Sequence, residues 1–112
     1  NFKNETQNTV ISKIVHNKYF IVFNRTLANA EKLAKELNGS ARELANIKDY
    51  NEGFDVLITC TSAQEPIITK DVYSSLLGND CSKKVIIDLA LPADVDVSII
   101  ASNDLCYIDI ES

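Results

Sequence analysis

Four short apolar runs recur along this chain, and stretches with the periodicity of helices separate them. The runs are KYFIVF at residues 18–23, DVLITCT at 55–61, KKVIIDLA at 83–90 and LCYIDI at 105–110. They are continuous rather than alternating in polarity and rich in β-branched or aromatic residues, which is typical of strands buried on both faces of a sheet. Their alternation with helices predicts an α/β fold, a doubly wound and mostly parallel sheet with helices on both faces.

Two segments between these runs have clear helical spacing. Leucines and alanines recur on one face over residues 27–37, where Asn24 or Thr26 can cap the start and Gly39 can end the helix. Residues 69–77 form a second amphipathic pattern that begins with a threonine cap. Both segments are therefore predicted to be helices of the outer layers.

The beginning of the chain also predicts a helix. Residues 5–15 place Val10, Ile11, Ile14 and Val15 on one face at helical spacing. This helix is expected to precede the first of the apolar runs.

Two segments are less regular. Residues 40–54 are predicted to form a short strand followed by a polar turn or a one-turn helix. Residues 91–102 are predicted to form a loop and a short helical piece. The chain contains no internal repeat and no linker.

Length and charge restrict the classes of protein to which this chain can belong. With 112 residues, 46% of them hydrophobic, the chain is expected to form one domain over residues 1–112. The net charge of −5 argues against a general nucleic-acid surface, because phosphate backbones favour a basic patch. No apolar run approaches the roughly 20 residues of a membrane span. No signal peptide opens the chain, and a cytoplasmic location is expected.

The cysteines favour neither a metal site nor a disulfide framework. Cys60, Cys81 and Cys106 are an odd number at wide spacing, without a CxxC pair or a Cys/His cluster. We expect reduced, buried thiols of a cytosolic protein and no metal ligands.

The turn Asn24-Arg25-Thr26 carries the most specific chemistry. In a dinucleotide-binding sheet the residue that ends the second strand meets the adenosine ribose. An acid there favours NAD, whereas an arginine beside small polar residues suits a 2′-phosphate, because a guanidinium binds phosphate through paired hydrogen bonds. The turn therefore favours NADP(H) if the chain binds a dinucleotide. The alternative is an ordinary capped turn with a solvated arginine.

Three distant segments, read together, resemble one enzyme family. NRTLANAEKLAKEL, DVLITCTSAQEPIIT and VIIDLALPADVD, followed by YIDIES, resemble the Rossmann-like nucleotide-binding domain of glutamyl-tRNA reductases, the NADPH-dependent enzymes that open the tetrapyrrole, or porphyrin, pathway. The resemblance covers nearly the whole chain and is most specific in EPIIT at 65–69 and DLALPADVD at 88–96. Shikimate dehydrogenases share the NRT start, but they usually carry Asn-x-Thr-Pro where this chain has Thr-Ser-Ala. That difference favours the reductases.

The resemblance implies NADP(H) as the cofactor and assigns it to three loops. The residues implied to contact it follow three strands: Asn24, Arg25, Thr26, Thr61, Ser62, Ala63, Ala90 and Pro92. The first three match the turn that holds the adenosine 2′-phosphate. The next three match the loop beside the middle of the cofactor and its ribose, and the last two match the segment near the nicotinamide.

The resemblance also implies partners beyond these residues. In the family, a cysteine of a separate N-terminal domain attacks glutamyl-tRNA, and NADPH reduces the thioester to glutamate-1-semialdehyde. A C-terminal helical domain makes the homodimer. None of the three cysteines here matches the nucleophile. The chain alone is therefore expected to carry no catalytic residue and to be inactive, with its parent protein as the enzyme.

The glycine loop of a dinucleotide-binding domain is missing. Aligning the first predicted helix puts Phe2, Asn4 and Gln7 at the GxGxxG positions and leaves no room for a full first strand. Backbone amides of that helix would hold the pyrophosphate only with an intact loop. Two alternatives stay open: a non-catalytic Rossmann-like interaction module, or a domain of another NADP-dependent oxidoreductase such as a shikimate dehydrogenase relative.

Other residues with chemical potential are expected to be structural. His16, the single histidine, falls at the end of the first predicted helix and lacks a catalytic partner. Asp94 and Asp96 are expected in a solvated turn that caps a helix. Lys83 and Lys84 are expected to flank a strand rather than to bind phosphate.

Overall fold

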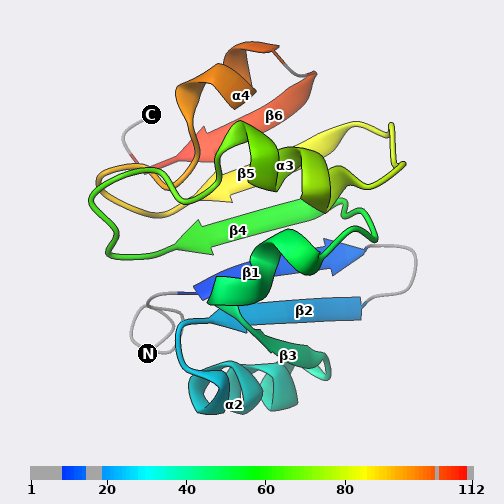
Figure 1. Cartoon of the computed structure of the whole chain (residues 1–112), viewed down its shortest axis with the longest axis vertical. Helices are drawn as coiled ribbons and strands as arrows, with labels where there is room; N and C mark the ends of the chain where they lie inside the picture. The colour runs from blue at the N-terminus through cyan, green and yellow to red at the C-terminus, as the bar shows by residue number, and fades with distance from the viewer. Residues whose placement is uncertain (1–8, 15–18, 103, 111–112) are drawn as a thin grey trace.

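A single six-stranded sheet organises the chain (Figure 1). The computed structural model describes residues 9–14, 19–102 and 104–110. Its elements, in chain order, are β1 (Thr9–Ile14), β2 (Tyr19–Asn24), α2 (Leu27–Leu37), β3 (Ser40–Glu43), the 3-10 helix η2 (Leu44–Asp49), β4 (Val56–Cys60), α3 (Lys70–Leu77), β5 (Lys84–Asp88), α4 (Val97–Ser102) and β6 (Leu105–Asp109). None of the helices in the described part of the chain is long and apolar enough to cross a membrane.

The sheet is mostly parallel, as the apolar runs predicted. Its strand order is β3-β2-β1-β4-β5-β6. The pairs β2–β3, β4–β5 and β5–β6 are parallel, and only β1 runs against its neighbours. The α/β prediction is confirmed, and so are the irregular segments, because residues 40–54 contain β3 and η2 and residues 91–102 contain α4.

The predicted first helix is wrong over the residues that the structure describes. Residues 9–14 form β1, in the middle of the sheet, where Thr9 lies opposite Asn24 of β2 and Cys60 of β4. Residues 5–8 and 15 of the expected helix lie outside the described residues. The segment TVISKI is rich in β-branched residues, which fit a pleated strand better than a helix. The inner edges of β2 and β4 also need a hydrogen-bonding partner, which a helix cannot supply.

Helices cover both faces of the sheet, but different parts of it. On one face η2, α3 and α4 pack over a core that includes Phe23, Leu57 and Ile86. On the other face α2 packs against β2 and β3 through a smaller cluster around Val22 and Leu33. Each face of the shared sheet thus has its own cluster of buried apolar side chains, the larger one under η2, α3 and α4.

The helix ends follow the sequence signals in part. Thr69 caps α3, because its Oγ1 accepts a hydrogen bond from the Val72 amide at 3.4 Å. At the end of α2 the left-handed residue is Asn38, with φ 57°, and Gly39 follows it. A Cβ on Gly39 would lie 2.2 Å from the Phe20 carbonyl oxygen, so a glycine is required by close approach to β2 rather than by its backbone angles.

Candidate functional site

The loops that were predicted to bind a ligand lie along one edge of the sheet. They follow β2, β4 and β5. Since β1 is antiparallel to both β2 and β4, these two strands run in the same direction and their carboxyl ends meet at the same edge, together with that of β5. In open α/β sheets this is the edge where ligands bind.

The turn after β2 is built by Asn24 and leaves Arg25 free to point outward. Asn24 is 3% exposed, and its Oδ1 accepts a hydrogen bond from the Thr26 amide at 2.9 Å. The Thr26 carbonyl then accepts from the Asn29 and Ala30 amides, each at 3.1 Å, which starts α2. Thr26 occupies the N-cap position, but its side chain makes no capping hydrogen bond. The turn is therefore preformed by a buried amide.

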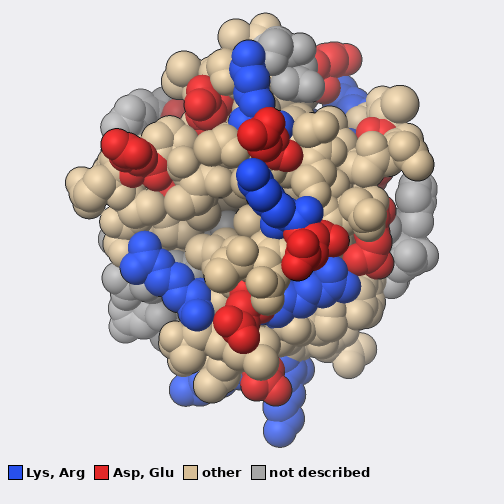
Figure 2. All heavy atoms as spheres, viewed as in Figure 1, with Lys and Arg blue, Asp and Glu red and all other residues tan. Residues whose placement is uncertain are grey.

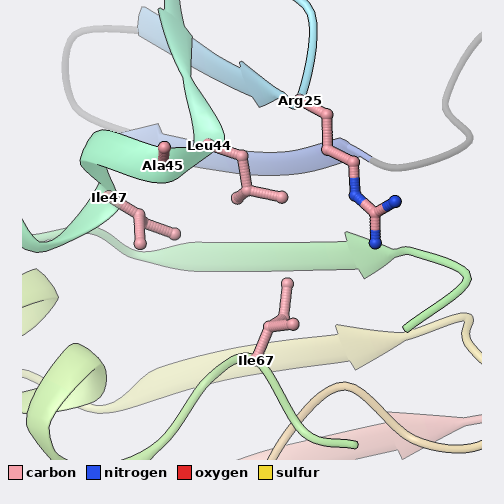
Figure 3. A pocket seen from close by; sticks show the side chains of 5 residues that line it. All are labelled: Arg25, Leu44, Ala45, Ile47 and Ile67. Atoms are coloured by element: carbon pink, nitrogen blue, oxygen red, sulfur yellow. The ribbon is translucent and has the colours of Figure 1, made fainter. Parts of the chain in front are cut away.

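A cavity of about 400 Å³ opens beside this turn. Arg25, Leu44, Ala45, Ile47 and Ile67 line it. Figure 3 shows the Arg25 side chain extending from the end of β2 toward the end of β4, while Leu44, Ile47 and Ile67 converge on the space between η2 and the loop after β4. An apolar slot with one cation at its border suits a flat apolar ring joined to an anionic group.

Charges around the cavity leave Arg25 available. Among the described residues no carboxylate lies within ion-pair distance of Arg25. Figure 2 shows acidic and basic side chains interspersed over the face that carries η2, α3 and α4, without a broad patch of one sign. The local cation, rather than the net charge of −5, would therefore meet an anion at this edge.

The loop after β4 is fixed by a buried carboxylate. Asp94 is 0% exposed, and its Oδ2 accepts a hydrogen bond from the Thr61 amide at 2.9 Å. Its Oδ1 accepts a second, very short hydrogen bond from the Thr61 hydroxyl. The Thr61 Oγ1 in turn accepts from the Ala63 amide at 3.2 Å. Thr61 and Ala63 are thus oriented by a residue 33 positions further along the chain.

The loop after β5 is fixed by a second buried carboxylate. Asp88, also 0% exposed, accepts hydrogen bonds from the amides of Ala90 at 3.1 Å, Asp94 at 2.8 Å and Val95 at 3.0 Å. The Tyr107 hydroxyl of β6 donates a further one at 3.2 Å. The segment that carries Ala90 therefore closes around the end of its own strand.

A short parallel bridge joins the two loops. Ile68 pairs with Val95, the Ile68 amide donates to the Asp94 carbonyl at 2.9 Å, and the Asp96 amide donates to the Ile68 carbonyl at 3.0 Å. Ile68 and Val95 are almost completely buried. Backbone hydrogen bonds thus join the loops after β4 and β5, and Ile67 of the cavity wall precedes the bridge residue Ile68.

Burial is the main cause of a raised pKa at the Asp94 carboxyl. Removal from water raises the pKa of the Asp94 carboxyl above its ordinary value, and the neighbouring Asp88 acts in the same direction. The hydrogen bonds from Thr61 oppose this rise, because they favour the charged carboxylate.

The eight residues implied by the resemblance separate into two groups. Asn24, Arg25 and Thr26 form the turn beside the cavity, and only Arg25 lines it. The loop residues after β4 and β5 form the second group, in which Thr61 and Ala90 are buried while Ser62 and Pro92 are exposed. Hydrogen bonds through the two aspartates connect the members Thr61, Ala63 and Ala90.

Sequence reasoning missed both the aspartates and the apolar wall of the cavity. Asp94 was expected in a solvated turn, which is wrong, because the loop folds back over the end of β4 and buries it. Asp96 does cap α4, through its Oδ1, which accepts from the Ser98 amide at 2.9 Å. An aspartate directly after an apolar strand, as Asp88 is, was an available signal. In contrast, the residues of η2 that line the cavity lie in a segment without clear hydrophobic periodicity, so no sequence pattern pointed to them. They are Leu44, Ala45 and Ile47.

Further expectations need correction or lie outside the described residues. Cys81 and Cys106 are exposed free thiols rather than buried ones, while Cys60 is partly buried. Lys83 is exposed as expected, but Lys84 is buried as the first residue of β5. His16 and the positions aligned with the missing glycines are not among the described residues.

The pyrophosphate site expected at the first helix is absent from the described structure. That site needs a strand whose carboxyl end leads into a helix at the ligand edge. Instead β1 starts at this edge, opposite Asn24, and ends at the other edge, where Ile14 lies opposite Tyr19. The buried carboxylates at this edge, Asp88 and Asp94, are engaged in hydrogen bonds to the loops. No group of His, Cys, Asp and Glu within the described residues could hold a metal ion.

Comparisons with known proteins give a match to one family model and similarity to individual enzymes. A family model described as shikimate / quinate 5-dehydrogenase matches residues 4–112. The glutamyl-tRNA reductase of Archaeoglobus fulgidus is 36% identical over 94 residues, covering 81% of this chain and 22% of that protein. The glutamyl-tRNA reductase of Marinomonas sp. is 40% identical over 88 residues, covering 78% of this chain and 21% of that protein.

A solved structure gives the same answer. The glutamyl-tRNA reductase from Methanopyrus kandleri is similar to this chain with a TM-score of 0.63 and 30% sequence identity, covering 81% of this chain and 23% of that one. The chain thus spans about a fifth of the length of the relatives it matches.

Proposed function

The chain belongs to the shikimate / quinate 5-dehydrogenase family, and on this premise we propose that it is the NADP(H)-binding domain of a glutamyl-tRNA reductase. The parent enzyme would reduce glutamyl-tRNA to glutamate-1-semialdehyde, the entry to tetrapyrrole biosynthesis, and would act as a homodimer in the cytoplasm. The thioester and the tRNA would be held by other domains, because this chain spans about a fifth of the relatives' length.

The position of Arg25 carries the proposal. It is the charged residue at the border of an otherwise apolar cavity, at the carboxyl edge of a parallel pair of strands. The adenine ring would occupy the slot between Leu44 and Ile67, and the Arg25 guanidinium would bind the 2′-phosphate through paired hydrogen bonds. An acid at this position would instead favour the free ribose hydroxyls of NAD.

The remaining loops would place the other half of the cofactor. The described residues fit the adenosine 2′-phosphate half, whereas the reversed β1 provides no helix start for the pyrophosphate. Thr61, Ser62 and Ala63 would lie beside the middle of the cofactor, and Ala90 and Pro92 near its nicotinamide. NADPH supplies the hydride when it is bound. The chain's own residues would bind and orient it, and none of them would act as a nucleophile.

One observation favours a different function for the isolated chain. The antiparallel β1 occupies the place of the strand that leads into a glycine loop in dinucleotide-binding domains. A non-catalytic Rossmann-like module, used for contact with another protein, would tolerate this change. A domain of a shikimate dehydrogenase relative is the other alternative, and the match to that family model supports it.

A calorimetric titration of the folded chain with NADPH and with NADH tests the proposal. Saturable binding of NADPH, at least about tenfold tighter than that of NADH, is expected if Arg25 binds the 2′-phosphate. Equal affinities would contradict the assigned cofactor. Absence of binding by either, in a chain with a cooperative unfolding transition, would favour the non-catalytic module. Turnover of glutamyl-tRNA or of shikimate by the parent protein separates the two enzymes.

A further inference from the structure

Two fully buried carboxylates lie at the edge of the sheet where a ligand would bind, but they take no part in the cofactor contacts proposed above. Asp88 and Asp94 are each 0% exposed, and together they accept six hydrogen bonds from described residues: two from Thr61, one each from the amides of Ala90, Asp94 and Val95, and one from the Tyr107 hydroxyl. Burying a carboxylate is costly unless such partners surround it. Five of the six hydrogen bonds come from the loops after β4 and β5 and the sixth from Tyr107 of β6, so the two carboxylates are satisfied at the edge where a ligand would bind.

The hydrogen bonds form a continuous path across the edge. The Ala63 amide donates to the Thr61 hydroxyl, and this hydroxyl donates to Asp94. The backbone amide of Asp94 donates to Asp88, at the end of β5. The path therefore begins in the loop after β4 and ends at β5, and two of its members, Thr61 and Ala63, are the residues proposed to lie beside the middle of the cofactor.

We propose that Asp94 is a positioning residue, which acts through Thr61 to set the loop after β4 at the correct place relative to the loop after β5. The inference rests on the proposed cofactor site. Asp94 takes both donors of Thr61, its amide and its hydroxyl, so Thr61 has one orientation. The contact is buried, and a buried polar group that loses its partner is destabilising, so the loop favours the arrangement that keeps both hydrogen bonds.

The role proposed for Asp94, orienting Thr61, differs from simply holding the two loops together. The Ile68–Val95 bridge and its backbone hydrogen bonds already hold the two loops together. They act further along the loop, however, at Ile68 and Val95, whereas residues 61–66 belong to neither a helix nor a strand. Removing the carboxylate should therefore loosen Thr61 and Ala63 while the strands stay paired.

Four variants test the inference: Asp94→Asn, Thr61→Val, the double variant, and Asp96→Asn as a control. Asp96 lies two positions from Asp94 in the same loop, and its side chain accepts from Ser98. Hydrogen exchange of the Ala63 amide is measured against the Leu57 and Ile86 amides, which lie in β4 and β5. NADPH affinity is measured by calorimetry on the same samples.

Asp94→Asn should speed exchange at Ala63 and weaken NADPH binding, each by about tenfold, while exchange at Leu57 and Ile86 changes less than twofold. Asp96→Asn should leave both readouts within about twofold of the unmodified chain. Because Asp94 acts through Thr61, the double variant should be no weaker than the weaker of the two single variants.

Three results would overturn the inference. These are unchanged exchange at Ala63 in Asp94→Asn, additive effects in the double variant, or faster exchange with unchanged NADPH affinity. If the unmodified chain binds no NADPH, the proposed function fails and the role of Asp94 toward a cofactor fails with it. Exchange at Ala63 then decides alone whether Asp94 orders the loop.

Discussion

The Lys84 Nζ lies 2.5 Å from the Asp80 Oδ2, and the Lys84 side chain is only 2% exposed. Ser82 Oγ accepts a second hydrogen bond from the ammonium at 2.9 Å, and the Phe54 ring centroid lies 5.3 Å from it. This cluster lies at the amino end of β5, opposite the ligand edge, so it bears on stability and not on the cofactor site.

Replacing Asp80 with Asn should lower the free energy of unfolding by about 1–3 kcal/mol, because Lys84 stays buried without its counter-charge. The effect should stay below that of a fully buried pair, since the Asp80 side chain is 33% exposed. Chemical denaturation measures it. Asp104→Asn is the matched control, because its partner Lys83 is 3.9 Å away and both side chains are exposed. Its effect should stay below about 0.5 kcal/mol, and an equal loss in both variants would contradict this account.

The same pair should make stability depend on pH in the acid range. The hydrogen bond from Lys84, followed by those from Ser82, holds the pKa of Asp80 well below its ordinary value of 3.8. A lowered pKa in the folded state contributes stability that is fully present above the ordinary value and is lost as the pH falls toward the folded value. The difference in unfolding free energy between the unmodified chain and Asp80→Asn should therefore be constant above about pH 5 and shrink below it. A difference that grows on acidification would refute the assignment.

Arg25→Gln tests the origin of the cofactor preference. The variant should weaken NADPH binding by about tenfold or more and leave NADH binding nearly unchanged, because only NADPH carries the 2′-phosphate that the guanidinium would bind. Titrations with both nucleotides measure the ratio. Lys32→Gln removes the same charge from the exposed surface of α2 and lines no part of the cavity, so it serves as the control. Equal losses in the two variants would indicate a long-range charge effect instead.

Ala45→Phe tests whether the apolar slot holds the adenine. Ala45 is exposed at the cavity wall, so a larger side chain can enter the slot without disturbing the core. NADPH and NADH affinities should fall together, by about tenfold or more, because both nucleotides carry the same ring. Asn46→Phe places the same ring one residue away, outside the lining, and should change neither affinity by more than about twofold. Retained binding in Ala45→Phe would place the adenine elsewhere.

The sequence predicted the strands that lie within continuous apolar runs, and it predicted them for a physical reason. Residues buried on both faces of a sheet must be apolar whatever their neighbours are, so β2, β4 and β5 were recognisable locally. The edge strand β6 has the same apolar composition, although Cys106 and Ile108 on one of its faces are exposed. The turn at Arg25 was recognisable as well, because its polar residues stand between a strand and a helix. Because β2, β4 and β5 run in the same direction, the loops that follow them lie at the same edge of the sheet.

The sequence did not predict β1. Val10, Ile11 and Ile14 satisfy helical spacing and strand pairing alike, and the choice depends on the two open edges that β2 and β4 present in the folded sheet. Hydrogen bonding to β2 and β4 therefore outweighed the helical spacing of the apolar residues in this segment. The direction of β1 also affects the proposed cofactor site, because it decides whether a helix can begin at the edge where a pyrophosphate would bind.

By itself, then, the sequence determined the class of fold, the parallel strands whose following loops share one edge of the sheet, and the charge at the turn after β2, because each depends on residues that are close along the chain. Only the tertiary structure decided that Asp94 is buried against Thr61, 33 positions away, and that Ile67 faces Leu44 across a cavity. Burial and cavity shape arise from loops that close over one another, and no local pattern records which loops will meet.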